Sequence, residues 1–555
     1  MRFHIFYLSF IFLFFLNLLF ILFPFINNEI VIINEFMNIP DILKNGSIVK
    51  LGNENDLLKG VADNLIKLRF FPYKILEGMF FHHHMSFIEP AWLLNQGDNT
   101  PIHQYGILVS LLISSLASIS NDMLSIESYF KINYGSYFIF YFFIFLLLKK
   151  FIKNKINILI YFSLISLLIY SLGFLILYMT PTVSPLRQIF SPIIIYVVLL
   201  YFTNFKKIFI NCIFIFLVIY SFYNFHASVF IIFSIILIYL LLLITKKKTC
   251  KYSLYLSSTF FIIILVLNFY FNFNSGNSFS EIGIFFGSSL TFSSTLLIVF
   301  ILGLFYSIIS STDCLKNNDL QLLFLIFYSS MSLVFYAWNP SIVHLSQIFW
   351  IILFTLIFWI DKYLKKINSI SIFFFAFIIL TIIPTAESYF YKKTFYYDKI
   401  IDKISVFNWD FPNAKIKSTI DPILIDDSCK KFQKYHINKD IVMISEYDLF
   451  LPYVCGFKNK GFYPQLGQGL ISEKFYNKAL EYYDKQKPEY IFVDKAISNN
   501  NMDKDNFGFY SMISDYAFKK INYISQIKNV YNDLKIHYDL VEKGKLINVY
   551  KRKNK

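Results

Sequence analysis

The feature that most constrains the fold of this chain is a series of long, uninterrupted apolar runs. Each run approaches the ~20 residues that an α-helix needs to cross a lipid bilayer, and 56% of the 555 residues are hydrophobic. We therefore predict a polytopic α-helical membrane protein. The runs occupy approximately residues 5–25, 134–150, 156–178, 187–204, 208–224, 227–245, 253–272, 291–311, 320–337, 342–360 and 369–386.

The first run is expected to remain in the protein as an uncleaved signal anchor. Arg2 precedes residues 5–25. The run is too long for the core of a signal peptide, and no small-residue cleavage site follows it.

The distribution of lysine predicts the orientation of the spans. Every second connector between the later runs contains Lys, whereas the alternate connectors, 179–186, 225–226, 273–290 and 338–341, contain neither Lys nor Arg. Because cytoplasmic connectors are enriched in basic residues, the lysine-rich side is predicted to be cytoplasmic. This gives about eleven spans, a cytoplasmic N-terminus and a C-terminus on the outer side. The net charge of +15 follows from these connectors and the C-terminal region, so we expect no nucleic-acid partner.

A shorter apolar segment at 104–120 does not fit this alternation as a span. Its helix of about fifteen residues would reach only ~22 Å, less than the ~30 Å of the hydrocarbon core. Serines also recur along it. We predict a juxtamembrane helix in the outer interface, within one long outer loop over residues 26–133.

The C-terminal part has a soluble composition, so we divide the chain into a transmembrane module (1–388) and a small α/β domain on the outer side (389–555). Short apolar runs bounded by charged turns predict strands, an amphipathic segment predicts a helix between them, and a Glu-Lys-Gly-Lys turn predicts a hairpin. We find no convergent His, Cys or acid motif there, and expect this domain only to shape or cover the outer cavity. The strands are expected at 439–445 and 488–494, the helix at 472–486, and the hairpin strands at 538–541 and 546–550.

The C-terminal domain holds two of the five cysteines, Cys429 and Cys455. They can form a disulfide if the domain lies outside the cytoplasm. We nevertheless expect two unpaired thiols, because five cysteines are too few for a disulfide framework.

The predicted topology gathers the unusual polar residues at the outer side. Charged or imidazole groups at membrane depth are costly unless they line a wet cavity, which makes them candidates for a functional site. The candidates are His83, His84, Glu89, Asp98, Gln104 and Tyr105 of the outer loop, Arg187 and His226 at the ends of spans, and Asn339 and His344 before and within another span.

Each candidate also has a structural interpretation. Neighbouring histidines with Glu89 could bind a metal, but consecutive His side chains rarely converge on one ion, and we expect packing or headgroup contact instead. Arg187 could be an interfacial anchor. His226 and His344 could simply pack at helix ends, and Asp98, between Gly97 and Asn99, could be a turn residue.

One short segment resembles a known family. His83-His84, Pro90, Gly97 and Gln104-Tyr105-Gly106 are similar to a pattern in uncharacterised bacterial members of the GT-C superfamily of membrane glycosyltransferases. The architecture resembles this superfamily over the whole chain, with one N-terminal span, a long outer loop, many further spans and an outer C-terminal domain. The motif itself covers about 25 residues and is of modest specificity.

The resemblance implies a bacterial inner-membrane enzyme of cell-envelope assembly that uses a polyprenyl-phosphate-linked sugar. A glycan, lipid or protein would be the acceptor, and an acidic residue of the first outer loop the general base. The candidate bases are Asp98, Glu89, Asp41 and Glu35. Members of the superfamily usually carry the decisive acid soon after the first span, where this chain has no Asp-Glu pair. Many also carry Asp four residues before the Gln, where this chain has Thr100.

For the phosphate of the donor we favour Arg187, the only arginine among the spans. The remaining candidate side chains would contribute to donor binding. No cofactor is required by this chemistry, although a divalent metal is compatible with it.

Two other functions fit the same architecture. A polysaccharide polymerase or ligase also has many spans and a large outer loop, but the α/β C-terminal domain argues against it. A lipid-linked-sugar transporter would show inverted repeats and Gly- or Pro-broken helices at mid-membrane. This chain has only 18 glycines, and its polar groups lie at predicted outer ends.

Overall fold

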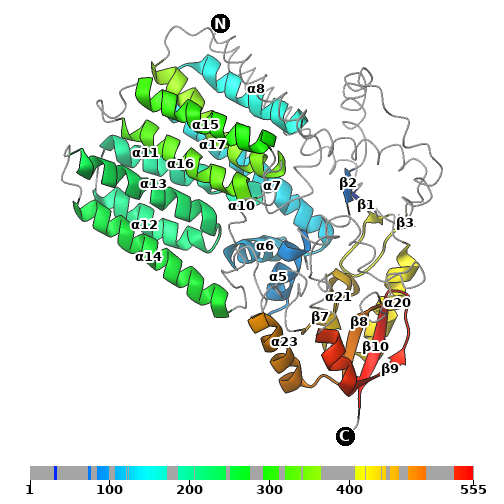
Figure 1. Ribbon diagram of the computed structural model, residues 1–555. Helices are drawn as coiled ribbons and strands as arrows, with labels where there is room; N and C mark the ends of the chain where they lie inside the picture. The colour runs from blue at the N-terminus through cyan, green and yellow to red at the C-terminus, as the bar shows by residue number, and fades with distance from the viewer. Residues whose placement is uncertain are drawn as a thin grey trace.

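The computed structural model is mostly helical, with a small α/β region at its C-terminal end (Figure 1). The structure describes residues 30–33, 73–76, 84–98, 107–120, 122, 124–171, 185–204, 207–245, 251–274, 292–311, 319–338, 342–363, 407–418, 421–438, 440–445, 450–461, 473–495 and 530–553.

Nine of the predicted apolar runs coincide with the helices of a bundle (Figure 1). Within the described residues, four of these helical segments are long and apolar enough to cross a membrane: Ile126–Phe151, Leu186–Thr203, Phe225–Ile244 and Lys251–Asn268. The runs at 5–25 and 369–386 lie outside the described residues. The bundle helices are α7 (Ile126–Phe151), α8 (Lys155–Ser171), α10 (Pro185–Gln188) with α11 (Ser191–Asn204), α12 (Lys207–Ser221), α13 (Phe225–Ile244), α14 (Lys251–Asn274), α15 (Phe292–Ser311), α16 (Leu320–Trp338) and α17 (Ile342–Tyr363).

The helix α7 begins earlier than the apolar run that predicted it. The Ser125 hydroxyl accepts a hydrogen bond from the Ser128 backbone N–H and so caps the first turn. The end of the predicted loop 26–133 is therefore helical from Ile126 onwards.

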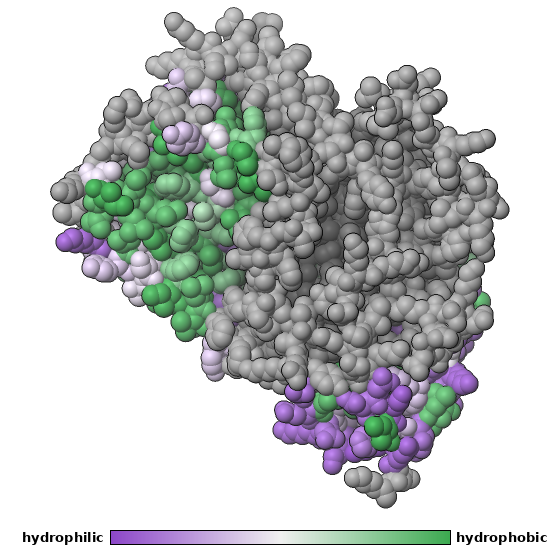
Figure 2. Space-filling model, viewed as in Figure 1, coloured by the Kyte–Doolittle hydropathy of each residue, from purple (hydrophilic) through white to green (hydrophobic). Residues whose placement is uncertain are grey.

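Much of the described surface of the bundle is apolar. Large side chains such as Ile215, Ile262, Val266 and Val299 are exposed on α12, α14 and α15. Figure 2 shows apolar residues gathered over the bundle and hydrophilic residues over the C-terminal region. An apolar surface of this kind is expensive in water but favourable in contact with lipid.

Two of the predicted lysine-rich connectors meet at one end of the bundle. The Asp361 carboxylate accepts hydrogen bonds from the backbone N–H groups of Lys153 and Asn154, at 2.7 and 2.8 Å. Nearby in the sequence, Lys362 forms an ion pair with Asp319 at 2.8 Å. The connector after α7 and the last turn of α17 therefore share one end of the bundle.

Two helices of the predicted outer loop (residues 26–133) pack against each other beside the bundle (Figure 1): α5 (Met85–Asn95) and α6 (Ile107–Ile119). The predicted helix at 104–120 is confirmed over Ile107–Ile119, a length of about 20 Å. Val109 and Ile113 are buried on one face, whereas Leu111 and Leu116 are exposed on another.

The C-terminal region contains the predicted helix and strands, except that the strand predicted at 439–445 is divided into two short strands, β5 and β6, of different sheets. Its main sheet has the order β6-β8-β10-β9, with β6 parallel to β8 and the β9–β10 hairpin antiparallel. Two further helices, α20 and α21, were not predicted. Asp421 caps α20 by accepting a hydrogen bond from the Ile423 N–H at 2.9 Å. The elements are α20 (Pro422–Tyr435), β5 (Asp440–Ile441), β6 (Met443–Ile444), α21 (Phe450–Cys455), β7 (Lys458–Asn459), α23 (Glu473–Gln486), β8 (Tyr490–Asp494), η4 (Lys535–His537), β9 (Tyr538–Glu542) and β10 (Ile547–Arg552).

A second sheet joins the predicted outer loop to the C-terminal region, in the order β2-β1-β4-β3. Strands β1 (Ile30–Ile33) and β2 (Tyr73–Leu76) come from the loop, whereas β3 (Phe407–Asn408) and β4 (Lys417–Ser418) belong to the C-terminal region. Strand β1 lies between β2 and β4 and is parallel to both. Backbone hydrogen bonds therefore connect segments that are nearly 400 residues apart in the chain.

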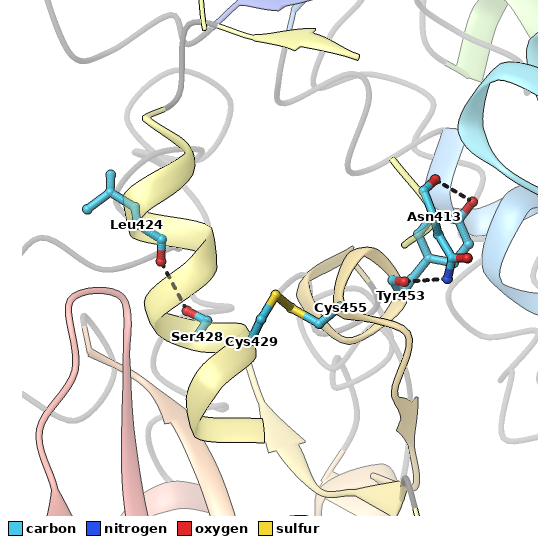
Figure 3. Close-up of a disulfide and its surroundings, with 6 residues drawn as sticks. All are labelled: Asn413, Leu424, Ser428, Cys429, Tyr453 and Cys455. Carbon is cyan, nitrogen blue, oxygen red and sulfur yellow. Dashed lines mark hydrogen bonds between the residues drawn. A yellow bond between two sulfur atoms is a disulfide. The ribbon is translucent and has the colours of Figure 1, made fainter. Parts of the chain in front are cut away.

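Our expectation of two unpaired thiols in the C-terminal region was wrong. Cys429 of α20 and Cys455 at the end of α21 form a disulfide, with their Cα atoms 5.2 Å apart (Figure 3). The two helices pack directly on each other, and this packing brings together cysteines that the sequence separates by 26 positions.

Candidate functional site

Arg187 lies in the short helix α10, which the turn between α12 and α13 holds in place. The Asn224 amide donates a hydrogen bond to the Arg187 carbonyl at 3.0 Å, and the Tyr223 hydroxyl donates one to the Leu186 carbonyl. Only 7% of the Arg187 surface is exposed. The backbone that carries this guanidinium is thus fixed by two side chains of a neighbouring turn.

The structure brings Arg187 together with His226, another candidate from the sequence. Arg187 Nη2 lies 3.2 Å from His226 Nδ1. Because a guanidinium can only donate, Nδ1 must be the acceptor, and the imidazole is then neutral with its proton on Nε2. A planar guanidinium at this position offers the paired donors that suit phosphate oxygens.

A small polar cavity lies next to this pair, among α10, α13, α16 and α17. Its volume is about 20 Å³, enough for one water molecule or one hydroxyl group. The polar lining residues carry amide, imidazole and hydroxyl groups, and none is acidic. The lining residues are Gln188, Asn224, His226, Ala227, Phe230, Tyr328, Ser332, Gln347, Ile348, Trp350 and Ile351.

Gln347 gives this cavity a clear chemical preference. Its side chain is buried, and its Oε1 has no hydrogen-bond partner within the part of the chain that the structure describes. A buried amide oxygen without a donor costs roughly 1–3 kcal/mol. A hydroxyl group that enters the cavity could donate to this oxygen and remove that cost.

A second group of charges lies where the predicted outer loop meets the C-terminal region. Asp98, after the end of α5, forms an ion pair with Lys460, after β7, with Oδ2 and Nζ 2.5 Å apart. The Asp98 side chain is only 9% exposed, compared with 38% for Lys460. Asp98 is therefore more than the simple turn residue that its neighbours Gly97 and Asn99 indicate.

Glu89 of α5 lies close enough to this ion pair to interact with both of its charges. Burial raises the pKa of the Glu89 carboxyl from 4.5 to about 8, the Asp98 charge adds to the rise, and the Lys460 charge opposes it. Glu89 is 2% exposed, and its Oε2 has no hydrogen-bond partner among the residues described. At neutral pH the group thus contains one protonated carboxyl beside one ion pair.

Helix α6 connects the two groups. It packs along α5, which carries Glu89, and the Leu108 N–H in its first turn donates to the Phe222 carbonyl at 3.4 Å. Phe222 belongs to the turn between α12 and α13 that holds Arg187. The Gln-Tyr-Gly segment at 104–106 directly precedes α6 but lies outside the described residues.

The other candidates divide into two sets. His84 is fully buried, with Nδ1 3.3 Å from the Tyr129 hydroxyl and its ring against Phe130, which supports packing as its role. No cluster of three or more metal-binding side chains occurs over the described ranges. The candidates outside the described residues, or with their side chains outside them, are Glu35, Asp41, His83, Gln104, Tyr105, Asn339 and His344.

Sequence reasoning missed the role of Lys460 entirely. It follows a two-residue strand in a lysine-rich region, and no local pattern distinguishes it from neighbouring lysines. Gln188 was also missed, although its position next to Arg187 at the start of a span was an available signal. No protein-family model matches the chain, and no curated protein matches it.

Proposed function

We propose that this protein is a membrane glycosyltransferase of the GT-C type, which moves a sugar from a polyprenyl-phosphate donor to an envelope acceptor. One observation carries the proposal. A buried arginine, fixed through its backbone, lies beside a cavity lined by amide and hydroxyl groups. This combination suits a ligand that presents a phosphate next to hydroxyl groups, which is the chemistry of a sugar phosphate.

In the proposed reaction Arg187 binds the donor phosphate and stabilises its growing negative charge. The acceptor hydroxyl oxygen forms a bond to the anomeric carbon, and the bond from that carbon to the phosphate oxygen breaks. The phosphate leaves with the electron pair as polyprenyl phosphate. Asp98 takes the proton of the acceptor hydroxyl as general base.

The cavity would contribute to donor recognition. Gln347 and Gln188 face a space for one hydroxyl group, and Trp350 supplies an aromatic wall. Uncharged amides that hydrogen-bond a sugar hydroxyl discriminate strongly against a donor that lacks it, because the amides then remain buried and unpaired.

The proposed location is the outer face of a bacterial inner membrane. The disulfide between Cys429 and Cys455 supports an oxidising compartment for the C-terminal region. The shared end of the Lys-containing connectors supports the opposite, cytoplasmic side for that end.

The test combines a binding and a transfer measurement on the purified full chain in lipid nanodiscs. Arg187→Lys keeps the charge but loses the planar fork, so we expect weaker binding of polyprenyl phosphate and slower transfer from labelled polyprenyl-phosphate sugars. Arg552→Lys, in strand β10, is the matched control and should change neither. Unchanged polyprenyl-phosphate binding in Arg187→Lys and Arg187→Gln would overturn the assignment of the phosphate site.

Amide substitutions distinguish between the candidate bases when the transfer rate of each variant is measured at saturating donor. Asp98→Asn should lower the transfer rate by ~10²–10⁴, the usual loss for a general base, with donor binding little changed. Glu89→Gln, Glu35→Gln and Asp41→Asn test the other loop acids. Normal transfer by Asp98→Asn together with an inactive Asp41→Asn would assign the base to Asp41.

A further inference from the structure

The C-terminal region contacts the outer-loop helix α5 and its neighbours at several points besides the shared sheet. The Tyr453 hydroxyl donates to the Leu124 carbonyl at 2.7 Å, and the Tyr453 ring packs edge-on against Trp92 with centroids 5.5 Å apart. The Asp98–Lys460 ion pair lies at the same junction. The soluble region is thus in direct contact with the loop that carries the candidate base.

We propose that Lys460 is a positioning residue for the outer-loop acids, so that the C-terminal region forms part of the transfer site instead of only covering it. The inference rests on the proposed function. Lys460 would act through Asp98, by fixing the orientation and charge of the carboxylate that takes the acceptor proton. The two residues are 362 positions apart in the chain, so only the folded C-terminal region can supply this cation.

The fold holds the Lys460 backbone firmly. Its N–H donates to the Ile441 carbonyl at 2.7 Å, and its carbonyl accepts from the Tyr482 hydroxyl at 2.8 Å. These contacts tie Lys460 to strand β5 and helix α23. A side chain extended from a fixed backbone loses less conformational entropy when it forms an ion pair, which favours one defined geometry.

The charge of Lys460 is maintained despite its partial burial. Desolvation works against the ammonium form, but the hydrogen bond and charge of Asp98, together with the charges of Asp440 and Tyr482, outweigh it, so the pKa of Lys460 is raised above its ordinary value. Asp440 and the Tyr482 hydroxyl also face this ammonium. On the loop side, Asp98 and Glu89 are the acids that interact with it.

One consequence is a division of roles between two neighbouring carboxyls. Lys460 stabilises a negative charge on Asp98, whereas the buried Glu89 keeps its proton at neutral pH. Like charges placed close together disfavour double ionisation, and a nearby cation partly offsets this. Without Lys460, both carboxyls should hold their protons to higher pH.

The experiment compares Lys460→Met, Lys460→Arg and the control Lys458→Met, which lies two residues earlier on β7. The readout is the pH profile of transfer at saturating donor. Lys460→Met should shift the acidic limb of the pH–rate profile to higher pH by about one unit or more, as expected when a carboxylate loses a neighbouring cation. Lys460→Arg should restore the profile, and Lys458→Met should leave it unchanged.

A purely structural role for Lys460 would lower the rate equally at all pH values. An unmoved acid side in Lys460→Met would therefore overturn this inference while leaving the proposed function intact. If the unmodified protein transferred no sugar from any polyprenyl-phosphate donor, both the proposed function and this inference would be contradicted. Infrared spectroscopy gives an independent readout, because the protonated-carboxyl band that Glu89→Gln abolishes should titrate at higher pH in Lys460→Met. An unshifted band would also contradict the inference.

Discussion

Replacing Glu89 by glutamine should make the stability of the protein less dependent on pH. The pKa of the buried carboxyl is about 8 in the folded protein and about 4.5 when exposed. Between these values the unfolded chain has lost the proton while the folded protein retains it, so the folded state loses stability as the pH rises. At about 1.36 kcal/mol per pKa unit, the full loss above pH 8 is about 5 kcal/mol relative to pH values below 4.5.

The amide that Glu89→Gln introduces would keep the size and polarity of the protonated carboxyl but cannot ionise. The variant should therefore resemble the wild type near pH 4.5 and become more stable than it as the pH approaches 9. The size of the gain is at most about 5 kcal/mol, because water entry and local relaxation lower the cost of a buried charge.

The measurement is the free energy of unfolding of the full chain in detergent, by chemical denaturation at several pH values from 4.5 to 9. Glu127→Gln is the matched control, since Glu127 is an exposed acid in the first turn of α7. A difference between Glu89→Gln and wild type that stays constant over this range would refute the reasoning. It would mean that Glu89 is ionised, or solvated, in the folded protein.

Three further outcomes follow from the structure. Replacing both Cys429 and Cys455 by Ser should lower the free energy of unfolding by roughly 3–4 kcal/mol from loop entropy, given their separation of 26 positions; a loss below about 1 kcal/mol in denaturant titrations would contradict it. In the same assay, Tyr453→Phe should lower the free energy of unfolding by about 1–3 kcal/mol, because it leaves the buried Leu124 carbonyl without its donor. An unchanged free energy of unfolding would show that this hydrogen bond does not stabilise the protein. A reporter fused after Lys555 should lie outside the cytoplasm and one fused near Lys247 inside, and a cytoplasmic C-terminus would overturn the outer-loop site.

The helices could be predicted from the sequence because their signal is local. An apolar run of sufficient length predicts a bundle helix whatever its packing partners are. Nine such runs are helical in the described residues. The strands at Met443–Ile444 and Tyr490–Asp494 were predictable for the same reason. The start of α7 at Ile126 was not, because a polar cap at Ser125 and a mixed first turn set it.

The features that the sequence did not reveal are long-range pairings. Strand β1 is four residues long and is recognisable only by its partners, β2 and β4. The disulfide required knowledge that α20 packs on α21. In the candidate site, the proximity of Arg187 and His226 agrees with the predicted convergence at one bundle end, whereas the partner of Asp98 could not be inferred.

These long-range contacts change the interpretation of the C-terminal region. If the C-terminal region were an independent domain that only covered the cavity, its interface with the loop would resemble a transient, polar protein–protein interface. Instead, the region shares a sheet with β1, buries Tyr453 against Leu124 and supplies the cation for Asp98. Each contact restricts the loop in a different way: the sheet fixes the direction of its first part, Tyr453 fixes the start of α7, and Lys460 fixes the end of α5. A loop constrained at three such points can hold a carboxylate in one orientation without a rigid helix on both sides. A fixed orientation of this kind is what the proposed general-base role of Asp98 requires.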